Sequence, residues 1–123
     1  MIGLLPIEGA IVMNRRVYGT DGLAPTMLTC AGGFTERKIG YNDMGKLRIR
    51  KLTEGECMRF MGFEKKDTEA CREVGLSRAN IYHQAGDSLV TTVMVGIFGE
   101  LFGFEDYTTT IQEYAEKLHK EVI

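Results

Sequence analysis

The stretch KLRIRKLTEGECMRFMG, residues 46–62, changes from one hydrophobic period to another. Its first seven residues are basic or apolar and alternate between the two types from Lys46 to Arg50, which is the pattern of a β-strand with two different faces. Thr53 and Glu56 then have the spacing of a helix capping box, in which the hydroxyl and the carboxylate each satisfy a free backbone N–H group. The stretch therefore predicts a strand that leads into a helix running to Met61 and stopping at Gly62.

The strand expected at 46–52 has one basic face, formed by Lys46, Arg48 and Arg50. This agrees with a charge asymmetry along the chain. Residues 1–51 carry eight Lys/Arg and four Asp/Glu, hence +4, whereas residues 52–123 carry seven and thirteen, hence −6, within a net charge of −2. A basic amino-terminal third can face nucleic acid phosphates although the whole chain is acidic. Chance variation in a small sample is the alternative explanation.

Upstream of this stretch the sequence indicates further β structure interrupted by glycine. Arg16–Tyr18 predicts a short strand, and residues 19–22 (GTDG) predict a turn. Pro25–Thr29 predicts a second strand, with proline at a permitted edge position, and Ala31-Gly32-Gly33 would end it.

Downstream the pattern is helical. The expected helices are one capped by Asp67 and ending near Gly75, one from Ser77 through Gln84 and stopped by Gly86, one from Ser88 to Phe102 closed by Gly103, and one capped by Asp106. The fold class expected is therefore α+β, with a small twisted β region in the amino-terminal half and a helical carboxy-terminal half.

Composition places the chain among soluble globular proteins with one modest core. The chain has 123 residues, of which 44% are hydrophobic and 26% charged. No apolar run reaches the roughly 18 residues of a membrane span. The three cysteines, Cys30, Cys57 and Cys71, lack zinc-site spacing, and no other metal site is expected. Reduced thiols and a cytoplasmic location are expected.

Three groups of residues together resemble one enzyme family. Residues 50–63 contain a basic pair and Leu-Thr leading to Glu-Cys and then Gly-Phe, and residues 82–90 read YHQAGDSLV. Upstream are Arg16–Tyr18, residues 22–26 (GLAPT) and Gly32-Gly33. In this order, over roughly residues 14–103, they resemble the last two conserved blocks of DNA cytosine-5 methyltransferases and the end of the target-recognition region.

The resemblance implies a role in DNA methylation, as in restriction-modification systems, with S-adenosylmethionine as cofactor. Family members hold this cofactor against a parallel sheet, flip a cytosine out of the duplex and attack it with a cysteine. The turn at Gly86, Asp87, Ser88 and Leu89 would offer N–H groups at a helix start to the methionine carboxylate. The alternative interpretation of this turn is that it is only the end of one helix followed by the N-cap of the next. Asp87 departs from the usual Asn and would repel a carboxylate but tolerate an ammonium group.

For DNA recognition, the resemblance assigns a loop that approaches base edges in the major groove. The loop residues are Thr29, Cys30, Ala31, Gly32 and Gly33, with Arg15, Arg16, Arg37 and Lys38 as phosphate contacts. A solvated glycine turn with ordinary surface charges is the alternative.

Three family features are absent from these residues. No cysteine follows proline as the family's nucleophile does, and neither Glu-Asn-Val nor Phe-x-Gly-x-Gly occurs. Cys57 and Cys71 are expected to be core thiols. The chain alone is therefore expected to be inactive and to bind S-adenosylmethionine weakly or not at all. Its expected partners are double-stranded DNA and a catalytic part on the same or a separate chain.

The expected organisation has three parts. Residues 1–51 would end the recognition region, residues 52–103 would carry the two blocks, and residues 104–123 would add an amphipathic helix. The helix expected at 88–102 is apolar over most of its circumference, which predicts self-association, most simply as a homodimer, or a partner that covers it. A different interpretation is a small DNA-binding regulator with a helix-turn-helix at residues 67–85.

Overall fold

A computed structural model of the chain describes residues 2–6, 8, 11–20, 25–29 and 35–120. Its sheet has the order β1-β2-β3-β4, with β2 and β3 parallel and the other two pairs antiparallel. The strands are β1 (Gly3–Leu4), β2 (Arg16–Tyr18), β3 (Lys38–Asp43) and β4 (Lys46–Lys51), with a short helix α1 (Val12–Arg15) before β2.

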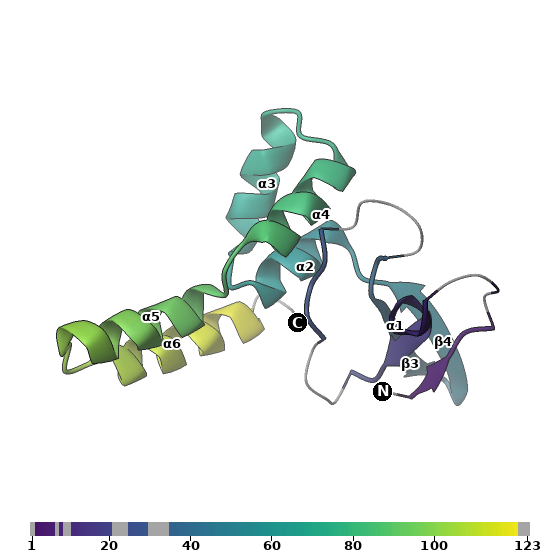
Figure 1. Cartoon of the computed structure of the whole chain (residues 1–123), viewed down its shortest axis with the longest axis horizontal. Helices are drawn as coiled ribbons and strands as arrows, with labels where there is room; N and C mark the ends of the chain where they lie inside the picture. The colour runs from purple at the N-terminus through teal and green to yellow at the C-terminus, as the bar shows by residue number, and fades with distance from the viewer. Residues whose placement is uncertain (1, 7, 9–10, 21–24, 30–34, 121–123) are drawn as a thin grey trace.

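Five helices follow the sheet, which confirms the α+β class. They are α2 (Glu54–Phe60), α3 (Lys65–Glu73), α4 (Arg78–Asp87), α5 (Thr91–Phe102) and α6 (Tyr107–Lys120). Figure 1 shows the sheet at one end of the molecule, α2, α3 and α4 in the middle, and α5 with α6 projecting as a helical hairpin at the other end. The middle group therefore lies between the sheet and the helical hairpin.

The core lies between α2 and α4 and includes one residue from the segment that precedes the sheet's long strands. Its buried members are Met27, Leu52, Cys57, Met58, Ile81 and Ala85. Cys57 is thus a core thiol, as predicted, and Cys71 packs at the edge of the same cluster. These contacts fix the helices that carry the two sequence blocks.

Several local predictions are confirmed. Thr53 and Glu56 form the capping box of α2, and Gly62 follows this helix with φ +88°. Residues 16–18 form β2, and the alternating stretch forms β4. Gly103 closes α5 in the left-handed conformation. The capping box and the glycine helix ends depend on residues within one or two helical turns, so the sequence determines them locally.

Other predictions are wrong. Residues 25–29 form no strand. Asp67 lies in the first turn of α3, and Glu64 is the N-cap. Gly86 lies inside α4 and does not stop it, and α5 starts at Thr91 rather than Ser88. At Gly86 and Thr91 the reason is a contact with a distant segment, whereas Glu64 replaces Asp67 as the N-cap through a local capping box between the two residues.

By length and composition alone, the stretch Arg78–Phe102 is long and apolar enough to cross a membrane. The structure divides it into α4 and α5, separated by extended backbone at Ser88 and Val90. At 1.5 Å per residue, the 12 residues of α5 reach about 18 Å, less than the roughly 30 Å of a bilayer core. Neither helix is therefore a spanning helix by itself.

Candidate functional site

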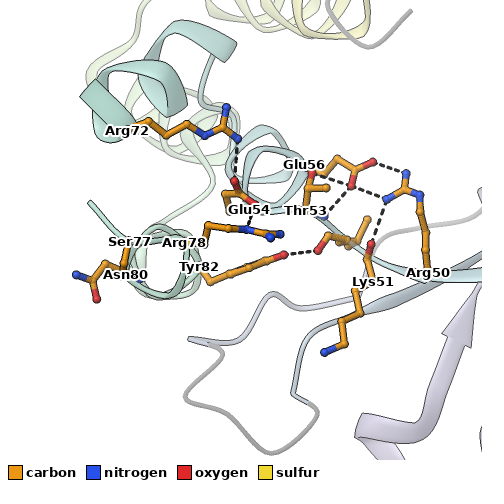
Figure 2. Close-up of polar contacts among 11 residues, drawn as sticks. Arg50, Lys51, Thr53, Glu54, Glu56, Arg72, Ser77, Arg78, Asn80 and Tyr82 are labelled. Carbon is orange, nitrogen blue, oxygen red and sulfur yellow. Dashed lines mark hydrogen bonds and ion pairs between the residues drawn. The ribbon is translucent and has the colours of Figure 1, made fainter. Parts of the chain in front are cut away.

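The junction between β4 and α2 is held by one carboxylate. The Arg50 guanidinium donates to both oxygens of Glu56 at 2.8 and 2.6 Å, as Figure 2 shows. The Thr53 backbone N–H and hydroxyl donate to Glu56 Oε2 at 2.8 and 2.9 Å. These hydrogen bonds, from Arg50 above all, lower the pKa of Glu56 to about 2, although burial acts in the opposite direction. The sheet and the helical part are therefore connected by a charge-assisted pair.

This pair predicts a specific dependence of stability on pH. Because the folded-state pKa of Glu56 is about 2, its stabilising effect is complete above the unfolded value near 4.5 and is lost as the pH falls towards 2. Between pH 5 and pH 3 the wild type should lose more free energy of unfolding than Glu56→Gln does. After allowance for solvent screening, the difference should be about 1 kcal/mol. Urea unfolding at both pH values measures this difference.

The control for this prediction is Glu69→Gln, which removes an exposed carboxylate from an i,i+4 pair with Lys65. That variant should keep the wild-type acid dependence. If Glu56→Gln loses as much stability on acidification as the wild type, the Arg50–Glu56 pair does not connect the two parts in solution.

A second carboxylate joins the three central helices. Glu54, at the start of α2, is buried and accepts from Arg72 of α3 at 2.8 Å and from Arg78 of α4 at 3.1 Å. Burial alone would raise the pKa of Glu54, but the hydrogen bonds and charges of the two arginines outweigh it and lower the pKa. Glu54 therefore fixes the relative positions of α2, α3 and α4. No sequence motif indicated this cluster, because its members are far apart in the chain.

The structure brings the two sequence blocks together. The Tyr82 hydroxyl, from the second block, donates to the Leu52 carbonyl of the first block. Burial raises the pKa of Tyr82 to about 12, so the hydroxyl remains a donor at physiological pH. Ile81 and Ala85, on the same helix, are fully buried in the shared core.

The upstream region meets the same helix at Gly86. A Cβ atom at this position would lie 2.4 Å from the Leu28 carbonyl carbon and 2.4 Å from the Thr29 nitrogen. Only glycine allows this approach without displacement of a backbone. The two blocks thus meet at α4, and Leu28 and Thr29, which lie between the parts of the upstream group in the sequence, pack directly against the same helix.

The turn expected to bind the cofactor lies at the end of one helix and not at the start of the next. Gly86 and Asp87 complete α4, and the Ser88 N–H and hydroxyl bond to the carbonyls of Gln84 and Ala85 at 3.0 and 2.8 Å. The site is therefore a helix C-terminus, whose partial charge is negative, and not a helix start. The Asp87 carboxylate accepts from His83 Nδ1 at 2.7 Å. Leu89 follows with an exposed side chain.

The predicted phosphate contacts are mostly engaged inside the protein. Arg37 is buried and donates to the Thr26 carbonyl at 3.0 Å. Lys38 is buried and donates to the Asn14 carbonyl at 2.9 Å. Arg15 donates to the Leu5 carbonyl at 2.6 Å. These cations bind backbone carbonyls that precede the loop in the chain and are not exposed cations available to phosphates.

The remaining predicted recognition residues are described only in part. Arg16 lies in β2 and is half-buried, as is Thr29. Cys30, Ala31, Gly32 and Gly33 lie outside the described residues. The exposed cations in the sheet are those of β4, in which all six residues are exposed. Pairing with β3 keeps Lys46, Arg48 and Arg50 on one face, as expected.

Among the residues that the structure describes, no group of three or more His, Cys, Asp or Glu side chains could hold a metal ion. An apolar cavity of about 250 Å³ lies between α5 and α6. Thr92, Val95, Ile111 and Tyr114 line it, together with Thr91 and Thr110. Tyr114 also donates to the Gly62 carbonyl at 2.9 Å, and Lys117 pairs with Glu64 at 2.6 Å. The helical hairpin is thereby attached to the central helices at its base.

Residues 9–103 match the family described as C-5 cytosine-specific DNA methylase. The chain is similar to the type II methyltransferase M.HhaI of Haemophilus parahaemolyticus, with 33% identity over 106 residues that cover 84% of this chain and 30% of that protein. It is 38% identical over 98 residues to the orphan methyltransferase M.SPRI of Bacillus phage SPR, covering 80% of this chain and 22% of the relative.

The orphan methyltransferase M.SPBetaI of Bacillus phage SPbeta is 28% identical over 144 residues, covering 82% of this chain and 32% of the relative. The chain therefore spans no more than about a third of the length of these three relatives. No solved structure matches the chain significantly. Helix α6 lies outside the part of the chain that matches the family.

Proposed function

The chain belongs to the C-5 cytosine-specific DNA methylase family, and we propose that it forms the part of a DNA (cytosine-5)-methyltransferase that recognises DNA and completes the cofactor pocket. One observation carries this proposal. The upstream segment and both sequence blocks converge on α4, through Gly86, Tyr82 and Leu52. A recognition segment and a cofactor segment packed on one helix can be positioned together over a single DNA site.

The nucleophile of the reaction is proposed to come from a catalytic part on the same or a separate chain. Cys57 is buried in the core, and Cys71 donates weakly to Gln84 at 3.7 Å. Neither follows a proline, as the nucleophile of the family does. We therefore assign no catalytic residue to this chain and expect these 123 residues to be inactive alone.

The residues near the end of α4 fit one end of S-adenosylmethionine better than the other. A helix C-terminus and the Asp87 carboxylate are both negative, so they favour the ammonium group of the methionine part over its carboxylate. The exposed Leu89 lies beside them and could cover an apolar part of the cofactor. When bound, the cofactor supplies the methyl group. The chain contributes only the holding residues Gly86, Asp87, Ser88 and Leu89.

The catalytic part is also the proposed occupant of the apolar face of α5. Leu89, Val93, Ile97 and Leu101 are each more than half exposed, although such a row is normally buried. This part of the chain lies within the family match, and the alignments cover only 32% and 30% of the length of two relatives. The helix-turn-helix interpretation is less well supported, because residues 38–51 form two strands of a sheet that it does not require.

The test measures transfer of labelled methyl groups from S-adenosylmethionine to duplex DNA. The chain alone should give background incorporation, and a chimera in which it replaces the aligned segment of M.HhaI should transfer methyl groups. Transfer by the chain alone that survives Cys→Ser changes at Cys30, Cys57 and Cys71 would contradict the proposal. So would a chimera that folds and binds S-adenosylmethionine but does not methylate DNA.

A further inference from the structure

The turn between β3 and β4 has an unusual composition. Asp43 pairs with Lys46 across the hairpin, so the turn consists of Met44 and Gly45, with φ of 49° and 80°. Both residues have a left-handed backbone conformation, as in a type I′ turn. The first position of such a turn normally holds Asn, Asp or Gly. Met44 is the single non-glycine residue with a positive φ in the described part of the chain. Its side chain is 99% exposed. A strained residue that exposes a large apolar side chain indicates a function at that point.

The strands that carry this turn are strongly basic. Residues 38–51 contain five Lys/Arg and one Asp, hence a charge of +4. β4 is the edge strand of the sheet, and its residues are all exposed. Arg50 and Lys51 are engaged by Glu56 and Glu36. Nearer the tip, Arg48 pairs with Asp43 in an exposed ion pair, and Lys46 has no ion-pair partner among the described residues.

Protection of an edge strand against aggregation would explain the lysines. It does not explain Met44, because an exposed apolar residue at the tip acts against that purpose. Both features together fit a ribbon that inserts into duplex DNA. The major groove accepts a two-stranded β-ribbon, phosphates lie along its rims, and apolar side chains make contact with base edges such as the thymine methyl group.

We propose that the β3–β4 hairpin enters the major groove of DNA, with Lys46 and Arg48 on phosphates and Met44 against base edges. This inference rests on the proposed function and adds a contact to it that is separate from the glycine loop. The hairpin lies at the end of the molecule away from α5 and α6 (Figure 1), so DNA bound there leaves the apolar face of α5 free for the catalytic part.

The experiment is DNA binding by the full chain, measured by fluorescence anisotropy with a short labelled duplex over a range of salt concentrations. Met44→Asn suits the type I′ turn, so the fold should be retained or strengthened. DNA binding should nevertheless weaken about fivefold with an unchanged salt slope, because an apolar contact is lost. Lys46→Ala should reduce the salt slope by about 0.9.

The matched control is Lys65→Ala, which removes an exposed lysine from α3 and should leave the slope unchanged. If Met44→Asn and Lys46→Ala both bind DNA as well as the wild type does, the inference is overturned. Methyl transfer by the chimera would still support the proposed function in that case. Failure of the wild-type chain to bind the duplex at low salt would also overturn it. Failure of methyl transfer with intact, hairpin-dependent DNA binding would instead contradict the proposed function.

Discussion

Gly86→Ala should destabilise the chain by about 2 to 3 kcal/mol. The added methyl group would lie 2.4 Å from backbone atoms of Leu28 and Thr29 and 2.6 Å from the Leu28 oxygen. These are backbone atoms, so no side-chain rotation can relieve the overlap. Either residues 25–29 move away from α4 or the helix end distorts, and Met27 then leaves the core. The gain in helix propensity from glycine to alanine, up to about 1 kcal/mol, offsets only part of this cost.

The control is Gly96→Ala, because Gly96 is also a helical glycine with a different environment. A Cβ atom there would meet Ile111 at 3.6 Å, an ordinary van der Waals distance. This variant should be as stable as the wild type or more stable by up to about 1 kcal/mol. Urea unfolding followed by circular dichroism compares the two. If both glycine variants have wild-type stability, residues 25–29 do not pack on α4 in solution.

The same glycine illustrates what a sequence reveals about the fold. Gly62 and Gly103 were correctly predicted as helix ends, because each has positive φ directly after the last helical turn. Gly86 was predicted by the same rule to end a helix, yet it lies within α4. Glycine is required at this position because a segment more than 50 positions earlier in the chain closely approaches the helix there. The local rule has no information about such a contact.

The strands show a similar division. β4 was predicted because basic and apolar residues alternate in it from Lys46 to Arg50. β3 was not predicted, since Gly40 and two polar residues weaken its pattern and pairing with β4 determines its conformation. Pro25–Thr29 has residues typical of a strand, but Pro25 lacks an N–H group and the segment packs on a helix instead.

For the candidate site, the sequence was a better guide to the segments that form it than to the role of each side chain. The order of the blocks correctly indicated the family. Arg37 and Lys38 were nevertheless expected on the surface, whereas their cationic groups bind carbonyls of Thr26 and Asn14. Burial of a charged side chain depends on carbonyl acceptors that arrive from distant segments, and sequence patterns do not record those acceptors.

The double change Val93→Asp and Ile97→Asp should abolish self-association of the isolated chain and reduce methyl transfer by the chimera at least about 100-fold. Val93 and Ile97 are 56% and 53% exposed on α5, next to the exposed Leu89 and Leu101. Helix α6 packs on another side of α5, where Tyr107 lies against Gly99. The uncovered row is a continuous apolar face, and burial of two carboxylates in any contact made there is unfavourable.

On the proposed function the isolated chain lacks the part that would cover this face, so the wild type should exceed monomer mass in light scattering at low micromolar concentration. In a two-fold dimer each substitution acts twice, which explains the large expected effect. The control places the same two charges on α6, at the exposed Thr109 and Gln112, and should keep both the wild-type mass and the chimera's activity. A wild-type monomer that binds no dye for apolar surfaces would mean that another part of the chain covers α5. Full activity of the Val93→Asp/Ile97→Asp chimera would show that the catalytic part docks elsewhere.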